Sequence, residues 1–219
     1  SLNGPKAAVI RTVQLKDFDV GGSAIPQLRW SPDATSLVAA MQWQIRLVTG
    51  IPAAPTVRTL RHPDYARLAQ QDSFAGSISS QGIAFSPDSR KLALCFDRPT
   101  GVTVYDVSTG NVTQSLRPAD ADHPWSPTPL VGFSPGGEWI VTSHDQRGQN
   151  GVYQFWSTKT WTAAQAMTKQ GQFAGFLGDG SALALVANSP GALEVWTTDQ
   201  LAQSYSVKSG LLPNGFDAP

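Results

Sequence analysis

The sequence Ile83-Ala84-Phe85-Ser86-Pro87-Asp88 recurs, with variation, at three other places in the chain of 219 residues. The related segments run from Leu28 to Asp33, from Val131 to Gly136 and from Ala174 to Asp179. Each has an aromatic residue at its third position, and these residues lie 55, 48 and 43 positions apart. Such a spacing approaches the roughly 40–45 residues of a repeated four-stranded unit. The sequence therefore predicts four copies of one unit, joined by connections of unequal length.

Every copy has the same internal order. The aromatic residue precedes Ser-Pro-Asp or an equivalent, where proline presets φ and aspartate can bond back to the backbone, which predicts a tight turn. A second, apolar segment follows and is expected to be a strand covered on both faces, in the ranges Ser36–Met41, Lys91–Phe96, Trp139–Ser143 and Ala182–Ala187. A third strand is expected at Ile45–Val48, Val102–Asp106, Val152–Trp156 and Leu193–Trp196. A fourth, more polar strand suits the outer edge of each sheet, and in the last copy it is expected near residues 204–207.

The second copy resembles the WD-repeat β-propeller family. The resemblance rests on Phe85-Ser86-Pro87-Asp88 together with Tyr105-Asp106, which stands where the family has the Trp-Asp pair at the end of its third strand. The third and fourth copies have Trp156-Ser157 and Trp196-Thr197 at that place, and the Gly-His dipeptide of the family is missing from all copies. The resemblance implies a propeller of four-stranded blades that serves as an interaction module.

We predict an all-β chain, folded over residues 1–219 as a single β-propeller domain or propeller segment. About four antiparallel four-stranded blades are expected at residues 25–61, 81–117, 129–168 and 172–208, with an extra N-terminal strand at residues 7–15. The resemblance implies seven or eight blades, so four leave a ring incomplete. The chain is then part of a longer protein or pairs with another chain, for example as a homodimer with eight blades. A small ring closed on itself ranks last.

Composition limits the partners. The 16 basic and 16 acidic residues give a formal net charge of zero, which disfavours nucleic acid and anionic membrane surfaces as partners. No apolar run approaches the roughly 20 residues that cross a bilayer. The single cysteine, Cys95, excludes an intrachain disulfide framework, and it lies in an apolar run where a small buried side chain is expected. With no signal-type segment in residues 1–5, a cytoplasmic protein is predicted.

Catalytic signatures are missing from the sequence. There is no glycine-rich phosphate loop, no His-Glu-x-x-His, no cysteine pair and no Gly-x-Ser-x-Gly. His144-Asp145 is interpreted as a surface turn rather than a metal or general-base site. We therefore predict no enzyme activity, no catalytic residue, no metal and no cofactor. The alternative is a propeller-type enzyme or small-ligand binder that uses the mouth of the central channel.

The loops carry the candidate binding site. The long connection at residues 61–81 and the loops between second and third strands are expected to open on the same face of a propeller, as is the connection at residues 117–129. Tryptophan, tyrosine and arginine dominate the energy of many protein interfaces. The candidate partner-binding residues are therefore Trp43, Arg61, His62, Tyr65, Arg98, Trp125 and Arg147. The alternative is that Trp43 and Trp125 pack down as loop anchors.

The four aromatic residues of the repeat are expected to be buried where neighbouring blades meet. On that basis Phe85→Ala is expected to cost on the order of 3–5 kcal/mol. Together these expectations describe a noncatalytic interaction or scaffold module that binds a protein partner through one face.

Overall fold

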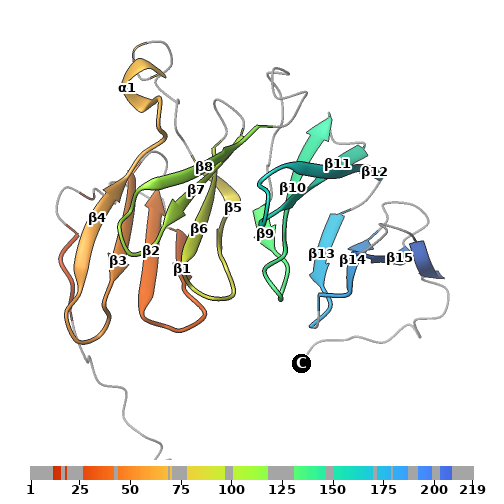
Figure 1. The fold of residues 1–219 in the computed structure, drawn as a ribbon, viewed down its shortest axis with the longest axis horizontal. Helices are drawn as coiled ribbons and strands as arrows, with labels where there is room; N and C mark the ends of the chain where they lie inside the picture. The colour runs from red at the N-terminus through yellow and green to blue at the C-terminus, as the bar shows by residue number, and fades with distance from the viewer. Residues whose placement is uncertain are drawn as a thin grey trace, which may run out of the picture.

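A computed structural model describes residues 12–15, 18, 27–41, 44–68, 70, 78–96, 101–117, 131–146, 150–169, 172–178, 180–186, 192–198 and 203–208. Within these ranges sixteen strands form four sheets, each of four antiparallel strands in chain order (Figure 1). We call the sheets blades 1 to 4. The predicted fold class, an all-β propeller of four-stranded antiparallel blades, is confirmed.

The strands of each blade have the following bounds. Blade 1 contains β1 (Gln27–Trp30), β2 (Ser36–Met41), β3 (Gln44–Thr49) and β4 (Thr56–Leu60). Blade 2 contains β5 (Ile78–Phe85), β6 (Lys91–Phe96), β7 (Gly101–Asp106) and β8 (Val112–Leu116). Blade 3 contains β9 (Val131–Phe133), β10 (Trp139–Gln146), β11 (Asn150–Ser157) and β12 (Ala163–Lys169). Blade 4 contains β13 (Gln172–Phe176), β14 (Ala182–Val186), β15 (Ala192–Thr197) and β16 (Gln203–Lys208).

The Ser-Pro-Asp segments form the turns between first and second strands. The Ser31 hydroxyl donates to Asp33 Oδ1 at 2.6 Å and accepts the Ser36 backbone N–H at 2.9 Å. Ser86 and Asp88 repeat the first of these bonds in blade 2, also at 2.6 Å. The Ser31 hydroxyl, helped by the Thr35 backbone, lowers the pKa of Asp33 to about 2. Each turn is thus held by bonds that its own residues supply.

Successive residues of β6 pack against different neighbours, because side chains alternate across a strand. Leu92, Leu94 and Phe96 join a cluster with blade 1 residues that include Val38 and Leu47. Cys95 faces the other way, in a cluster that includes Ile140 and Trp156 of blade 3, and it is 1% exposed. The expectation that Cys95 is a buried apolar residue is confirmed. The core is therefore divided into layers between blades.

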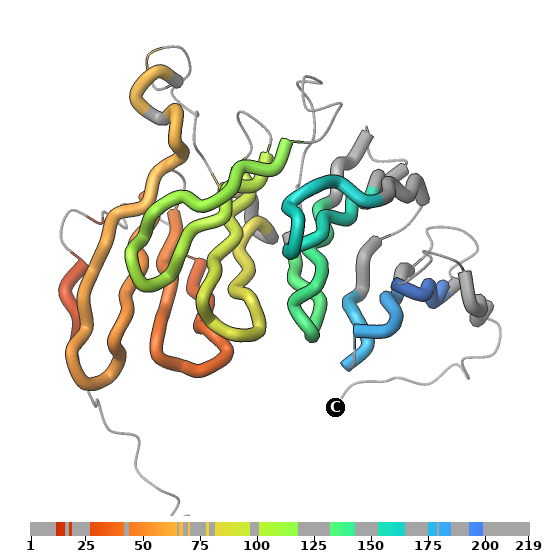
Figure 2. Tube along the Cα trace, viewed as in Figure 1, coloured from red at the N-terminus to blue at the C-terminus, as the bar shows by residue number. Residues whose placement is uncertain are grey.

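The blades form an open arc. In Figures 1 and 2 they follow one another from blade 1 at one end to blade 4 at the other, and the sheets of the described residues do not close into a ring. The inner strands β1, β5 and β9 are neighbours within this arc. The two end blades therefore each have one face without a described sheet against it.

The aromatic residues of the repeat differ in burial. Phe85, Phe133 and Phe176 are partly buried, and each packs against the cluster that its blade shares with the preceding blade. Trp30 is 55% exposed. The prediction that all four are buried is therefore wrong. Trp30 belongs to blade 1, and no described sheet precedes it.

Two further expectations are changed by the structure. The interpretation of His144-Asp145 as a surface turn is wrong, because β10 continues through both residues, which pair with Val152 and Gly151 of β11. Of the expected N-terminal strand at residues 7–15, the described residues 12–15 are not in a strand, and residues 7–11 lie outside the described part. The Arg46 guanidinium lies over the Phe18 ring, 5.8 Å from its centroid, so the N-terminal segment contacts blade 1.

Candidate partner-binding face

Strand pairing defines the two faces of the arc. In blade 1, Met41 pairs with Gln44 and Ile45 pairs with Leu60, so the connection between β2 and β3 and the exit of β4 share one edge. We call this side the connection face. The Ser-Pro-Asp turns lie at the opposite ends of the strands, on the side that we call the turn face. The predicted grouping of the residue 61 connection with the loops between second and third strands agrees with this pairing.

Residues 61 and 62 are fixed where the chain leaves β4. The Tyr105 hydroxyl donates to the backbone carbonyl oxygen of Arg61 at 2.6 Å. The His62 ring contacts the Phe96 ring edge to face, with centroids 5.0 Å apart and planes at 88°. Tyr105 and Phe96 both belong to the cluster between blades 1 and 2. The segment that leaves blade 1 is thus attached to the core of blade 2.

The environment of His62 favours the neutral imidazole. Its Nδ1 accepts the backbone N–H of Asp64 at 3.1 Å, which places the proton of the neutral ring on Nε2. Burial lowers the pKa of His62, opposed in part by the Asp64 carboxylate. His62 is therefore a neutral, half-buried anchor of the connection, and its Nε2–H is the group left to donate.

The connection continues into a one-turn helix, α1 (Tyr65–Leu68). Figure 1 shows α1 standing away from the sheets on the connection face. The Arg67 guanidinium forms an ion pair with the Asp64 carboxylate at 3.7 Å, and both side chains are more than half exposed. A pair so exposed contributes little to stability. It does present both charges to solvent beside a helix that projects from the propeller.

A small pocket adjoins this segment. It has a volume of about 140 Å³ and is lined by His62, Pro63 and Asp64 from the connection, and by residues of β7, β8 and Arg117. It lies where the connection crosses blade 2. The pocket is too small for a cofactor of ordinary size, since ligand sites are usually about 300–1,000 Å³.

The structure brings together three of the seven predicted binding residues. Arg61, His62 and Tyr65 lie in the first part of the long connection that follows β4, although the Tyr65 side chain is not among those described. The other four lie outside the described residues: Trp43, Arg98, Trp125 and Arg147. Sequence reasoning missed the Asp64–Arg67 pair, which the spacing of three residues could have indicated.

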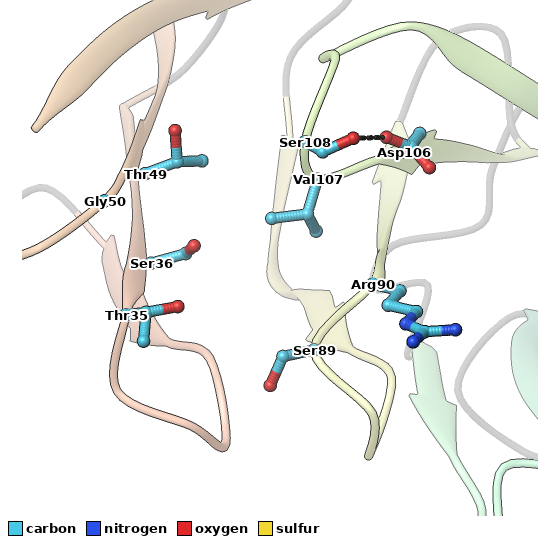
Figure 3. Close-up of a pocket in the computed structure, with 9 residues that line it drawn as sticks. All are labelled: Thr35, Ser36, Thr49, Gly50, Ser89, Arg90, Asp106, Val107 and Ser108. Atoms are coloured by element: carbon cyan, nitrogen blue, oxygen red, sulfur yellow. Dashed lines mark hydrogen bonds between the residues drawn. The ribbon is translucent and has the colours of Figure 1, made fainter.

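Two larger grooves lie on the turn face. One, of about 470 Å³, separates blades 1 and 2, where Thr35, Ser36 and Thr49 lie across from Ser89 and Val107 (Figure 3). A second, of about 320 Å³, separates blades 2 and 3. The positions of Ser36, Ser89 and Val107 are taken in the second groove by Lys91, Gly137 and Thr158. Because the grooves recur at equivalent positions, they follow from the spacing of the blades.

The carboxylate of the first groove, Asp106, is bonded within its own turn. Asp106 Oδ1 accepts the Ser108 hydroxyl at 2.6 Å and the Thr109 backbone N–H at 3.0 Å. The Ser108 hydroxyl is the main reason that the pKa of Asp106 falls to about 2. The Lys91 ammonium lies 3.4 Å from the other carboxylate oxygen. Asp106 is therefore an ionised turn residue and is not poised as an acid or base near neutral pH.

Two kinds of site are missing from the part of the chain that the structure describes. The described residues contain no group of three or more histidine, cysteine, aspartate or glutamate residues placed to hold a metal ion. They also contain no helix with the length and apolar character needed to cross a membrane.

Comparison with known proteins supports the fold. No family model and no curated protein matches the sequence. The structure is similar to a Kuenenia stuttgartiensis hydrazine synthase, with a TM-score of 0.61 and 13% identity over 87% of this chain and 52% of that chain. It is similar to the Dos1 propeller, with a TM-score of 0.59 and 17% identity over 83% of this chain and 47% of that one. It is also similar to the β-propeller domain of Myceliophteria thermophila Cps50 (Swd1), with a TM-score of 0.59 and 11% identity over 84% of this chain and 55% of that one. The chain thus spans about half the length of each of these three chains.

Proposed function

We propose that this chain is a noncatalytic protein-interaction module of WD-repeat type, which binds a protein partner through the connection face. One observation carries the proposal: the segment from Arg61 to Leu68 is fixed at its root and projects charged side chains from the propeller. The fixed root consists of the Tyr105 bond to Arg61 and the contact of His62 with Phe96. A loop held in place before binding loses less conformational entropy when a partner docks.

The residue types of the connection support the same function. Arginine and tyrosine are enriched among residues that dominate interface energy, and the connection has Arg61, Tyr65 and Arg67 within seven positions. The Asp64–Arg67 pair offers both a carboxylate and a guanidinium to a partner surface. A partner with both acidic and basic groups at its rim fits this arrangement. The proposal includes a cytoplasmic location, which the presence of one buried thiol and no second cysteine supports.

The proposal is tested with the whole chain as bait in a lysate of the source cells, in wild-type form and as the double variant Arg61→Glu, Arg67→Glu. The matched control is Lys159→Glu, an exposed charge reversal on the turn face. We expect at least one protein to be captured about 10-fold less by the double variant and equally by the control, which corresponds to about 1.4 kcal/mol. That protein is then purified and its affinity for all three baits measured by calorimetry.

The calorimetry decides the outcome. Binding of the purified partner to wild type and to Lys159→Glu, with a dissociation constant raised at least 10-fold for the double variant, supports the connection face as the binding site. If no protein distinguishes the double variant from the control, the proposal is wrong.

A further inference from the structure

The three joints inside the arc follow one rule. We call the side of a blade that faces the preceding blade its leading face, and the opposite side its trailing face. At the joint of blades 1 and 2, the leading face supplies Ile83, Phe85 and Leu92, and the trailing face supplies Ile45 and Leu47. The next two joints use the positions of Phe85, Leu92 and Tyr105, which are held by Phe133, Ile140 and Trp156 in blade 3 and by Phe176, Leu183 and Trp196 in blade 4. An aromatic from the inner strand lies on each leading face.

The register places the same residue types on the leading face of blade 1. Leu28 pairs with Ala39 as Ile83 pairs with Leu94, so Leu28 and Ile83 are equivalent positions. Ile83 is 6% exposed, whereas Leu28 is 51% exposed. Trp30, equivalent to Phe85, is 55% exposed. The inner strand of blade 1 therefore has the residue types of a leading face, but its large apolar side chains, Leu28 and Trp30, are exposed to solvent.

The outer part of this face is already covered. Arg46 and Val48 are buried, and Arg46 lies against Phe18 of the N-terminal segment. The most exposed apolar side chains of this face are thus Leu28 and Trp30 of β1, the strand nearest the axis of the propeller. A partner blade would meet this face at the inner strand.

The other end of the arc has the trailing half of a joint. Leu193 of β15 pairs with Val186 as Ile45 pairs with Ala40, so Leu193 and Ile45 are equivalent. Ile45 is 0% exposed, while Leu193 is 41% exposed. Val102 holds the same position in blade 2 and is 3% exposed. Val195, which is equivalent to Leu47, is 3% exposed, so Leu193 is the exposed residue of this trailing face. The exposed residues at the two ends therefore belong to the two opposite faces that meet at each joint inside the arc.

We propose that a second copy of this chain occupies both ends, so that two arcs form one ring. The leading face of blade 1 in each copy meets the trailing face of blade 4 in the other. A twofold axis makes the two joints identical and satisfies both ends at once. The chain covers 47% of the Dos1 propeller and 55% of the Cps50 (Swd1) propeller domain, so two copies supply about the length of one such propeller. The formal net charge of zero means that long-range repulsion between copies is small.

Solution mass gives the first test. Sedimentation velocity of the whole chain, over about 1–100 µM, should show a species of twice the chain mass of 23.3 kDa. Leu28→Lys on the leading face and Leu193→Glu on the trailing face should each weaken the dimer at least 100-fold. Val112→Glu is the control, because Val112 is also exposed, at 41%, but lies on an outer strand inside the arc.

Mixing the two variants tests which faces meet. In the mixed dimer one joint has two unchanged faces, and the other brings the introduced lysine of the first variant against the introduced glutamate of the second. We therefore expect equal amounts of Leu28→Lys and Leu193→Glu to restore the dimer that each lacks alone. Circular dichroism of each variant verifies that it is folded.

Three results would overturn the proposal. They are a wild-type monomer at 100 µM, a dimer that neither substitution weakens, and folded variants whose mixture stays monomeric. The last result would indicate that the dimer joins two leading faces or two trailing faces instead of one of each. None of these results bears on the connection face, so failure here is distinct from failure of the proposed binding function.

Discussion

Leu28 and Ile83 occupy the same position in successive blades, yet one is 51% exposed and the other 6%. Both lie on first strands and both pair with a buried residue of the second strand. The difference comes from the neighbouring blade, because the leading face of blade 2 meets blade 1 and that of blade 1 meets no described sheet. Position in the repeat thus determines which way a side chain points. Position in the arc determines what it contacts, so equivalent residues of blades 1 and 2 should respond differently to the same kind of substitution.

The largest difference is expected at the end of the second strand. Phe96 is 0% exposed, whereas its equivalent in blade 1, Met41, is partly exposed. Phe96→Ala should lower the free energy of unfolding by about 3–5 kcal/mol, since the cavity lies deep in the joint. Met41→Ala should cost about 1 kcal/mol when measured in the Leu193→Glu background, where our proposal removes the dimer. Urea denaturation measures both, and equal losses would mean that the end blade is as well covered as the inner one.

A smaller difference is expected between Ile83 and Leu28. Ile83→Ala should cost about 2–4 kcal/mol. Leu28→Ala should cost about 0.5 kcal/mol when measured in the Leu193→Glu background, where our proposal removes the dimer. In the wild-type background the same Leu28→Ala change should weaken the dimer. Similar losses for Ile83→Ala and Leu28→Ala in the monomeric background would contradict the exposed position of Leu28.

The hydrogen bond between Tyr105 of blade 2 and the connection should contribute less to the free energy of unfolding than Phe96 or Ile83 does. Tyr105→Phe removes the hydroxyl that donates to the Arg61 carbonyl oxygen and should cost about 1 kcal/mol. Val48, the equivalent residue in blade 1, has no hydroxyl. Limited trypsin digestion should cut after Arg61 or Arg67 several times faster in the variant, because the root of the connection is loosened. An unchanged cleavage rate would show that the contact of His62 with Phe96 is sufficient.

The smallest effect is expected at the turns, and here the two blades should behave alike. The pKa of Asp33 in the folded chain is about 2, below its ordinary value of 3.8, and that of Asp88 is lowered as well. For Asp33, the lowered pKa gives stability that is present above about pH 4 and is lost as the pH falls through about 2, and for Asp88 the effect has the same sign. Asp33→Asn and Asp88→Asn should each make the melting temperature less sensitive to acid over that range. Thermal melts at pH values near 4.5 and 2.5 provide the measurement. If the melting temperature of both variants falls between these pH values as much as that of the wild type, the prediction is contradicted.

Strand positions were predictable where the apolar pattern alone determined them. Ser36–Met41 and Lys91–Phe96 were predicted with the bounds that β2 and β6 have in the structure. Both runs are covered by sheets or chain on two sides, so their apolar character is continuous. The polar residues His144 and Asp145 have no apolar pattern that would indicate a strand. They nevertheless belong to β10, because their backbone pairs with that of β11.

The candidate site was predictable only in part. A long connection rich in arginine and aromatic residues identified Arg61, His62 and Tyr65 as neighbours in sequence. The role of His62 as an anchor depends on Phe96, which is 34 positions away in the chain, and no local pattern links them. The exposure of Trp30 likewise depends on which blade precedes it. Both are properties of packing between distant segments.

The unlike faces of each blade give the arc a direction. Its two ends are chemically different, so copies that meet end to end all add in the same sense, as subunits do in a filament. Such growth stops only if the accumulated rotation brings the last end back to the first. A change that opened the angle between blades by a small amount would leave every contact intact and still prevent closure. The product would then be an open helical polymer whose length rises with concentration.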